Sequence, residues 1–362
     1  MTVNRRVAAL AAVSAVTLTL ASCASSDRED SAGASGSGGG GDTITFGAAG
    51  APAMFDPFYG TDGETFRPAR QIFETLVDFK PGTADLAPGL ATKWTPSNGG
   101  KTWTFDLQQN VKFTDGTAFN ADAVCKNFTR MFDQNAAGQT AASYWADNMG
   151  GFKSKGAAEA LYKSCTPKGA NQVVIDINRP TSKFPALLGL PSFSMQSPTA
   201  MDKYKANNIT PQGDGYTYSE YALKYPTGTG KFKLEKYDEA NKTITMVRND
   251  DYWGDKAKPA RLVFKIIPDE TARKQALAAG TIDGYDLPNP VDWPKLKQDE
   301  NLQIRPAFNL LYLGLNPKAN PDLKDLKVRQ ALMYGINRDQ FVKTQLPEGA
   351  TVATQWIPST VD

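Results

Sequence analysis

The sequence contains no histidine, and this absence excludes several classes of functional site. Without imidazole the chain cannot form a Ser-His-Asp or Cys-His catalytic group, an H-E-x-x-H zinc site or direct histidine ligation of nickel. Gly228 to Lys231 is glycine-rich but lacks Walker spacing, and Lys231 is followed by Phe232 instead of Ser or Thr. The adjacent acids Asp250-Asp251 are typical of a turn and not of a glycosidase pair. We therefore expect no enzyme activity, no cofactor and no metal.

An excess of charge of one sign is also lacking. The 362 residues include 40 Lys and Arg against 38 Asp and Glu, a net charge of +2. Arg5 and Arg6 lie in an N-terminal leader, and no acidic residue precedes Asp27, so removal of the leader leaves 40 − 2 = 38 basic against 38 acidic residues. This balance gives no basic footprint for nucleic acid. With 41% hydrophobic and 22% charged residues, the composition is that of a globular protein of two or three domains.

The apolar run near the N-terminus is short. Val7 to Leu20 spans 14 residues, too few for a typical membrane-spanning helix, and it follows the positive pair Arg5-Arg6. Leu20-Ala21-Ser22-Cys23 then resembles a bacterial lipobox, so we predict a lipoprotein signal peptide over residues 1–23 and acylation of Cys23. The alternative is an ordinary secretory signal with a chance cysteine. Two acyl chains on Cys23 would hold the protein on a membrane.

Cysteine is scarce: only three are present. Apart from Cys23 there is one pair, Cys125 and Cys165, and in an exported protein an even pair predicts a disulfide. Two buried thiols are the alternative. Closing a loop of this length would stabilise the fold by about 4 kcal/mol.

Residues 24–41 are rich in Ser, Gly and Asp without apolar periodicity, which predicts a flexible tether.

The most informative stretch is Ala91 to Asp133. Its apolar residues Trp103, Phe105 and Leu107 alternate with polar ones, which predicts a strand preceded by a turn at residues 98–100. Asn120 is a good N-cap, and the side chains after it predict a helix face, formed by Val124, Phe128, Met131 and Phe132.

The same criteria predict elements along the rest of the chain. Strands are expected at 43–46, 173–177, 243–247, 262–267 and 310–315, and residues 228–234 are expected to enter a further strand that pairs with 243–247. Helices are expected at 65–76, 183–190 and 270–279, around Val328, Ala331 and Leu332, and after Asn337. Residues 135–169 are polar and rich in Gly, Ala and Lys, which favours loops and short helices.

The motifs and their order along the chain resemble those of a known protein family. The central stretch reads W-T-x-x-x-x-G-K-T-W-T-F-x-L-x-x-x-V-K-F-x-D-G-T-x-F-x-A-D-x-V, which is similar to the extracellular solute-binding protein family 5. Further segments resembling that family are G-T-G-K-F-K-L at 228–234, R-N-D-D-Y-W at 248–253, G-T-I-D at 280–283 and V-R-Q-A-L-M-Y-G-I-N-R-D-Q-F at 328–341. The family includes the oligopeptide-, dipeptide- and nickel-binding lipoproteins of ABC importers.

The resemblance implies a fold and a division into domains. The fold class would be α/β, a periplasmic-binding-protein-like two-lobe clam shell (type II, cluster C) with an extra domain in lobe one. Residues 42–73 and 191–308 would form the core domain of lobe one, and residues 74–190 the extra domain. Residues 309–362 would begin lobe two. Because family members run well beyond 362 residues, we expect a C-terminally truncated chain with an incomplete second lobe.

The family register also implies ligand-facing residues, in three segments between the lobes. The expected ligand-binding residues are Thr61, Asp62, Gly63, Glu64, Tyr285, Asp286, Leu287, Phe308, Asn309, Leu310 and Tyr312. The acids Asp62, Glu64 and Asp286 could accept from a cationic group, and the tyrosines offer an apolar face with a hydroxyl. Solvated loop acids and packed tyrosines are the alternative for each. Pro288 lacks an N–H donor where peptide binders often present polar groups.

The function implied is a membrane-anchored receptor that captures a small solute, foremost a short peptide, for an ABC permease. The expected location is the extracytoplasmic face of the bacterial membrane, as a lipid-anchored monomer. The alternatives are a cell-surface sensor or interaction lipoprotein of the same fold without a transport role, and a receptor for a non-peptide solute.

Overall fold

A computed structural model describes residues 42–298, 302–305 and 308–358. The leader, the tether and Cys23 lie outside these residues. Within the described part, no helix is both long and apolar enough to cross a bilayer.

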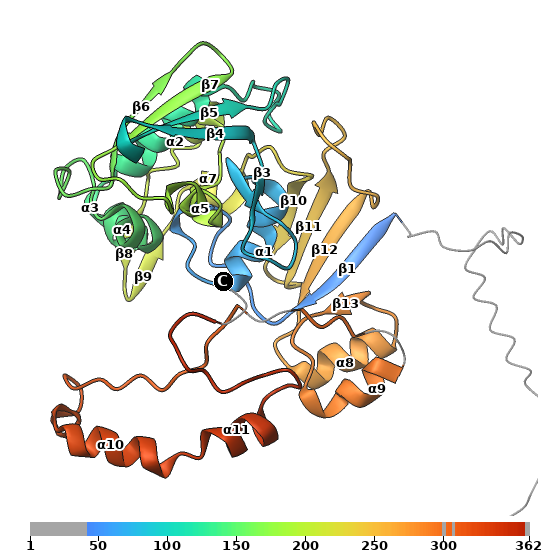
Figure 1. Cartoon of the computed structure of the whole chain (residues 1–362). Coiled ribbons are helices and arrows are strands. Elements are labelled where there is room, and N and C mark those ends of the chain that lie inside the picture. Colours follow the sequence, from blue (N-terminus) through green and yellow to red (C-terminus); the bar gives the residue numbers. More distant parts are fainter. Residues whose placement is uncertain (1–41, 299–301, 306–307, 359–362) are drawn as a thin grey trace, which may run out of the picture. The chain divides into compact units, whose positions relative to one another are not determined.

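The first sheet has five strands in the order β10-β11-β12-β1-β13. The strands are β1 (Thr43–Ala48), β10 (Phe232–Asp238), β11 (Thr243–Arg248), β12 (Arg261–Ile266) and β13 (Gly284–Tyr285). β1 runs parallel to β12 and β13, whereas β10, β11 and β12 are antiparallel (Figure 1). Phe46 pairs with Phe264, a residue more than two hundred positions later. The predicted strands at 43–46, 243–247 and 262–267 are thus confirmed, as is the strand entered through residues 228–234.

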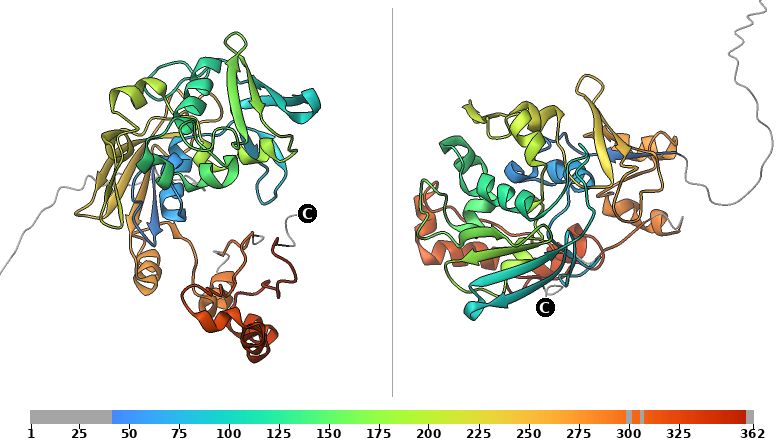
Figure 2. Two further views of the ribbon diagram at one scale, coloured as in Figure 1. Left: turned by 90° about the vertical axis from the view of Figure 1, so that its left-hand side faces the viewer. Right: turned by 90° about the horizontal axis from the view of Figure 1, so that it is seen from above.

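One face of this sheet is covered by α1 (Gly63–Ile72), which lies against β10 (Figure 2). Apolar side chains from the helix and the strands form a common core, namely Phe55, Ala69, Ile72, Phe73, Phe232, Ile244, Met246, Phe264 and Ile266. At the other end of the sheet, α8 (Glu270–Ala278) contacts β13. It ends before Gly280, whose φ of +66° suits a glycine, as the sequence predicts.

The second sheet is antiparallel throughout, in the order β4-β5-β7-β6. Its strands are β4 (Ala91–Ser97), β5 (Thr102–Leu107), β6 (Tyr162–Pro167) and β7 (Gln172–Ile177). The alternating residues of β5 and β7 are buried on one face, as predicted. α2 (Ala121–Phe132) starts at the predicted N-cap Asn120, whose side chain accepts from Ala123 N at 2.9 Å, and packs against β6 and β7.

A disulfide joins Cys125 of α2 to Cys165 of β6, with the two Cα atoms 5.2 Å apart. This confirms the predicted bond and rules out the alternative of two free thiols. The bond ties the helix to the edge strand of the sheet that it covers.

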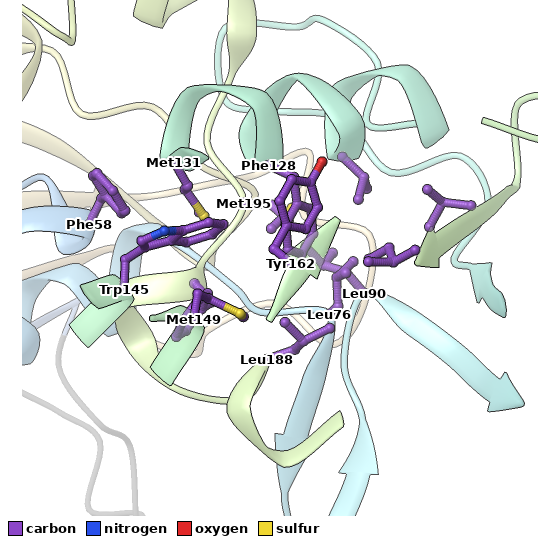
Figure 3. Packing of buried hydrophobic residues seen from close by; sticks show 14 of the residues in the cluster. Phe58, Leu76, Leu90, Phe128, Met131, Trp145, Met149, Tyr162, Leu188 and Met195 are labelled. Carbon is purple, nitrogen blue, oxygen red and sulfur yellow. The ribbon is translucent and has the colours of Figure 1, made fainter. Parts of the chain in front are cut away.

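The core between α2 and this sheet is centred on Trp145, which is fully buried. Figure 3 shows its indole near Phe58 and Met131. Phe128 and Tyr162 stack with ring centroids 5.4 Å apart, so helix and strand are joined by aromatic contacts as well as by the disulfide.

Shorter elements complete the described chain. The hairpins are β2 (Val77–Phe79) with β3 (Leu86–Pro88) and β8 (Thr210–Gln212) with β9 (Gly215–Thr217). The α-helices are α3 (Ala136–Ala141), α4 (Ser143–Met149), α5 (Phe184–Leu187), α6 (Pro198–Lys203), α7 (Glu220–Lys224), α9 (Trp293–Gln298), α10 (Leu326–Gly335) and α11 (Arg338–Gln345). The 3-10 turns are η1 (Pro57–Tyr59), η2 (Asn98–Gly100), η3 (Pro191–Phe193), η4 (Pro290–Asp292) and η5 (Pro321–Lys324).

Several predicted elements are wrong in extent. The helix expected at 65–76 starts at Gly63 because Asp62 caps it, and ends at Ile72, where Gly230 N donates to the Ile72 carbonyl. A Cβ on Gly228 would lie 2.2 Å from that carbonyl oxygen, so the G-T-G segment needs glycine to approach the helix end. The helix expected at 183–190 is only α5, because the chain turns where Gly189 meets the ring of Phe79.

One strand was missed by the sequence analysis, and one predicted strand is not found. Residues 135–169 contain α3 and α4 as expected, but they also contain β6, whose Lys163, Ser164 and Thr166 show no clear apolar alternation. The strand expected at 310–315 is absent from the described residues. The apolar run at 310–315 does not form a strand, because no neighbouring strand in the described part of the chain pairs with this segment.

Glu74 joins two of the family-like segments at the point where the chain leaves α1. Its carboxylate accepts from Thr229 Oγ1 at 2.7 Å, Tyr252 Oη at 2.6 Å and Trp253 Nε1 at 2.9 Å. Burial raises the pKa of Glu74 above its ordinary value, against the opposing effect of these three donors.

The raised pKa predicts a pH dependence of stability. Because the folded protein binds this proton more tightly than the unfolded chain, the stabilisation is complete below the unfolded pKa and is lost as pH rises through the folded value. We expect the free energy of unfolding of the wild type, relative to that of Glu74→Gln, to fall as the pH rises above 4.5, the ordinary pKa of a glutamate. Urea unfolding at a series of pH values measures the difference. A difference that grows with pH would contradict the prediction.

Candidate ligand-binding site

The first predicted segment, Thr61 to Glu64, lies at the N-terminus of α1, with Thr61 before the N-cap, whereas the sequence predicted a loop for these residues. Asp62 is the N-cap, and Gly63 and Glu64 are in the first helical turn. Asp62 Oδ1 accepts from Thr65 N at 2.9 Å, and Oδ2 accepts from Thr65 Oγ1 at 2.9 Å. A Cβ on Gly63 would meet nothing within 4 Å, so the protein itself leaves open space beside this glycine.

The second predicted segment begins at Tyr285, the last residue of the edge strand β13. Tyr285 pairs with Gly47 of β1, and its hydroxyl is buried without a hydrogen-bond partner among the described residues. Burial raises the pKa of Tyr285. Leu287 has a φ of +55° and is 79% exposed, an unusual conformation for a large apolar residue. This left-handed backbone conformation falls at the position just before Pro288.

Arg67, which sequence reasoning missed, joins these two segments. Its Nη2 lies 3.2 Å from Glu64 Oε1 and 2.8 Å from Asp286 Oδ2, and its Nε donates to Glu64 Oε2 at 3.3 Å. The guanidinium also lies over the ring of Phe46, 5.2 Å from the centroid. Burial alone would lower the pKa of Arg67, but the hydrogen bonds with Glu64 and Asp286 raise it overall. The i, i+3 spacing of Glu64 and Arg67 is visible in the sequence, whereas the contact with Asp286 is not.

The acids of the site are largely engaged within the protein. Asp62 uses both oxygens in the helix cap, Glu64 uses both on Arg67, and Asp286 uses Oδ2 on Arg67. Asp286 Oδ1 is buried and has no partner among the described residues. The sequence predicted three acids that could accept from a cationic group, but in the structure only Asp286 Oδ1 has no hydrogen-bond partner among the described residues. Three acidic side chains and Arg67 meet here, so the formal net charge of the group is −2.

The third predicted segment borders a separate hollow of about 620 Å³. The lining residues are Phe308, Asn309, Leu310, Leu311, Tyr312, Trp356 and Pro358. The rings of Tyr312 and Trp356 lie 4.8 Å apart, and sequence reasoning missed Trp356. Within the described residues, the polar contacts that link the first two segments do not extend to this one. The described part of the chain contains no cluster of three or more potential metal ligands.

Comparisons with known proteins agree with this architecture. The family description "Bacterial extracellular solute-binding proteins, family 5 Middle" matches residues 85–362. The dipeptide-binding protein of Escherichia coli is 32% identical over 332 residues, which cover 88% of this chain and 58% of that protein. Heme-binding protein A of Haemophilus influenzae is 30% identical, over 88% of this chain and 57% of that protein.

Among solved structures, the ABC transporter-associated periplasmic binding protein DppA from Helicobacter pylori, in complex with peptide STSA, has a TM-score of 0.65 and 28% identity. The match covers 83% of this chain and 57% of that one, so the chain spans somewhat over half the length of the relatives it matches. The α/β fold class of the type II periplasmic binding proteins is thereby confirmed. The chain belongs to the bacterial extracellular solute-binding proteins of family 5.

Proposed function

We propose that this protein is the membrane-anchored substrate-binding component of an ABC importer and that it captures short peptides. The observation that carries the proposal is the 32% identity to a dipeptide-binding protein along 88% of the chain. The ligand would contact the three predicted segments, which extend from Thr61 to Glu64, from Tyr285 to Leu287 and from Phe308 to Tyr312.

The division into domains is part of the same proposal. All strands of the five-stranded sheet fall within residues 42–73 and 191–308, the proposed core domain. All strands of the four-stranded sheet fall within residues 74–190, the proposed extra domain. Residues 309–362, with α10 and α11, would belong to lobe two. The separation of the two sheets in sequence supports these boundaries.

A non-peptide solute is the second candidate, because heme-binding protein A matches the same share of the chain at 30% identity. The absence of histidine weighs against it, since this chain offers no imidazole to an iron centre. Isothermal titration calorimetry of the full-length protein with dialanine, trialanine and haem distinguishes a peptide ligand from a non-peptide ligand. We expect binding of a peptide; binding of haem alone would contradict the peptide proposal.

Arg67→Met tests the proposed site directly. Removing the guanidinium leaves Glu64 and Asp286 to repel each other and separates the two segments that it joins. Because charge-assisted hydrogen bonds are lost from a pre-formed site, we expect peptide affinity to fall about tenfold or more. Lys274→Met, which breaks the Lys274–Asp292 pair on α8, is the matched control. Equal affinities of the Arg67 variant and wild type would remove Arg67 from the site.

The membrane anchor has its own test. If Cys23 carries the acyl chains, Cys23→Ser is expected to move the protein from the membrane fraction to the soluble fraction, because the lipid attachment is lost. Immunoblotting of fractionated cells measures the distribution. A variant that stays in the membrane fraction would show that another element anchors the protein.

A further inference from the structure

A buried ion pair includes Asp56, a residue that shortly precedes the first ligand segment in the chain. Asp56 is 0% exposed and Arg130 is 7% exposed, and Arg130 Nη2 lies 2.5 Å from Asp56 Oδ2. Asp56 precedes η1 and is five positions before Thr61, whereas Arg130 belongs to α2. The pair therefore connects the lead-in to the ligand segment with a helix of the proposed extra domain.

Asp56 also organises its own part of the chain. Its Oδ1 accepts from Phe58 N at 3.1 Å and from Gln196 Nε2 at 2.9 Å. The carboxylate thus caps η1 while its other oxygen is held by Arg130. Arg130 is fixed in turn, because its Nε donates to Asn207 Oδ1 at 2.8 Å.

The two residues after Pro57 also contact α2. The guanidinium of Arg130 lies 5.3 Å from the ring centroid of Phe58 and 5.5 Å from that of Tyr59. Tyr59 Oη donates to Gln134 Oε1 at 2.9 Å. Burial alone would lower the pKa of Arg130, but Asp56 and Tyr59 raise it overall, so the arginine stays charged.

The residues that connect Asp56 to the first ligand segment are buried and closely packed. Residues 56–60 are all buried, and Gly60 N donates to the Pro57 carbonyl at 3.1 Å. A Cβ on Gly60 would lie 2.8 Å from the ring of Phe66, so the chain passes close to α1. Two residues later Asp62 caps α1. Buried and hydrogen-bonded residues thus connect Asp56 to the start of α1.

We propose that Arg130, acting through Asp56, is a positioning residue by which α2 of the extra domain holds residues 61–64 in the geometry that binds ligand. Arg130 does not itself touch the ligand. This inference rests on the proposed function, because it takes residues 61–64 as part of the binding site. Under this proposal the extra domain affects the affinity for peptide through the position of residues 61–64, without a contact between Arg130 and the ligand.

The test uses the full-length protein with both partners replaced, Asp56→Asn and Arg130→Met. Asparagine retains the cap on η1, and the double change leaves no uncompensated buried charge, so this variant is expected to fold. Hydrogen exchange measured by mass spectrometry on peptides covering residues 59–66 is expected to be about tenfold faster than in wild type. Affinity for trialanine is expected to fall about tenfold, since pre-organisation is lost.

The control is Cys125→Ser with Cys165→Ser, which loosens the same domain without touching Asp56 or Arg130. Faster exchange of residues 59–66 in the double variant, but not in the disulfide-free control, supports the inference. Unchanged exchange in the double variant, or an equal rise in the control, overturns it. Wild type that binds no peptide would instead refute the proposed function, while the exchange data still decide whether α2 positions the segment.

Discussion

Trp145→Ala is expected to lower the free energy of unfolding by about 3 to 5 kcal/mol. Trp145 is fully buried, and its ring packs against five other aromatic rings, those of Phe58, Phe132, Phe152, Tyr162 and Phe193. Its Nε1–H donates to the Gly151 carbonyl at 2.8 Å. Alanine would leave a large cavity among rings that come from separate segments, together with an unpaired carbonyl.

Urea unfolding followed by circular dichroism measures this loss. Trp356→Ala is the matched control, because Trp356 is 70% exposed and its removal leaves no cavity in the core. We expect a change within about 0.5 kcal/mol for the control. Similar losses for the two variants would show that the packing around Trp145 does not support the fold.

Arg130→Met is expected to destabilise the protein by about 3 to 5 kcal/mol, because it leaves the Asp56 carboxylate buried without its counter-charge. Adding Asp56→Asn removes that charge, so the double variant should be more stable than Arg130→Met alone. A double-mutant cycle of thermal or urea unfolding measures the coupling between the two positions.

An exposed ion pair at the end of the same helix provides the comparison. Lys153 lies 2.5 Å from Asp133, with 62% and 47% of the side chains exposed. Lys153→Met is expected to change stability by less than about 1 kcal/mol, because water screens and solvates both charges. If the double variant at positions 56 and 130 were as unstable as Arg130→Met, the uncompensated charge of Asp56 would not be the cause.

Local signals in the sequence determined many of the elements correctly. The alternation of Trp103, Phe105 and Leu107 predicted β5, and Asn120 predicted the start of α2. Asn337 likewise caps α11, its side chain accepting from Gln340 N at 3.0 Å. Such features depend on the period of apolar residues and on the capping of free backbone N–H groups, which a few neighbouring residues encode. The disulfide was predicted without a local signal, from the even number of remaining cysteines in the chain.

Only the tertiary structure decided the order of the strands and the composition of the candidate site. β5 pairs with β7, with β6 at the edge, and β1 lies between β12 and β13. The contacts of Arg67 with Asp286, of Glu74 with Tyr252 and of Arg130 with Asp56 each join distant segments. Each such contact must offset the entropy of closing a long loop, and it forms because many side chains pack at once. A local pattern cannot show which distant segments will pack together. The sequence therefore determined the helices and strands, whereas the packing of many side chains decided which of them are neighbours.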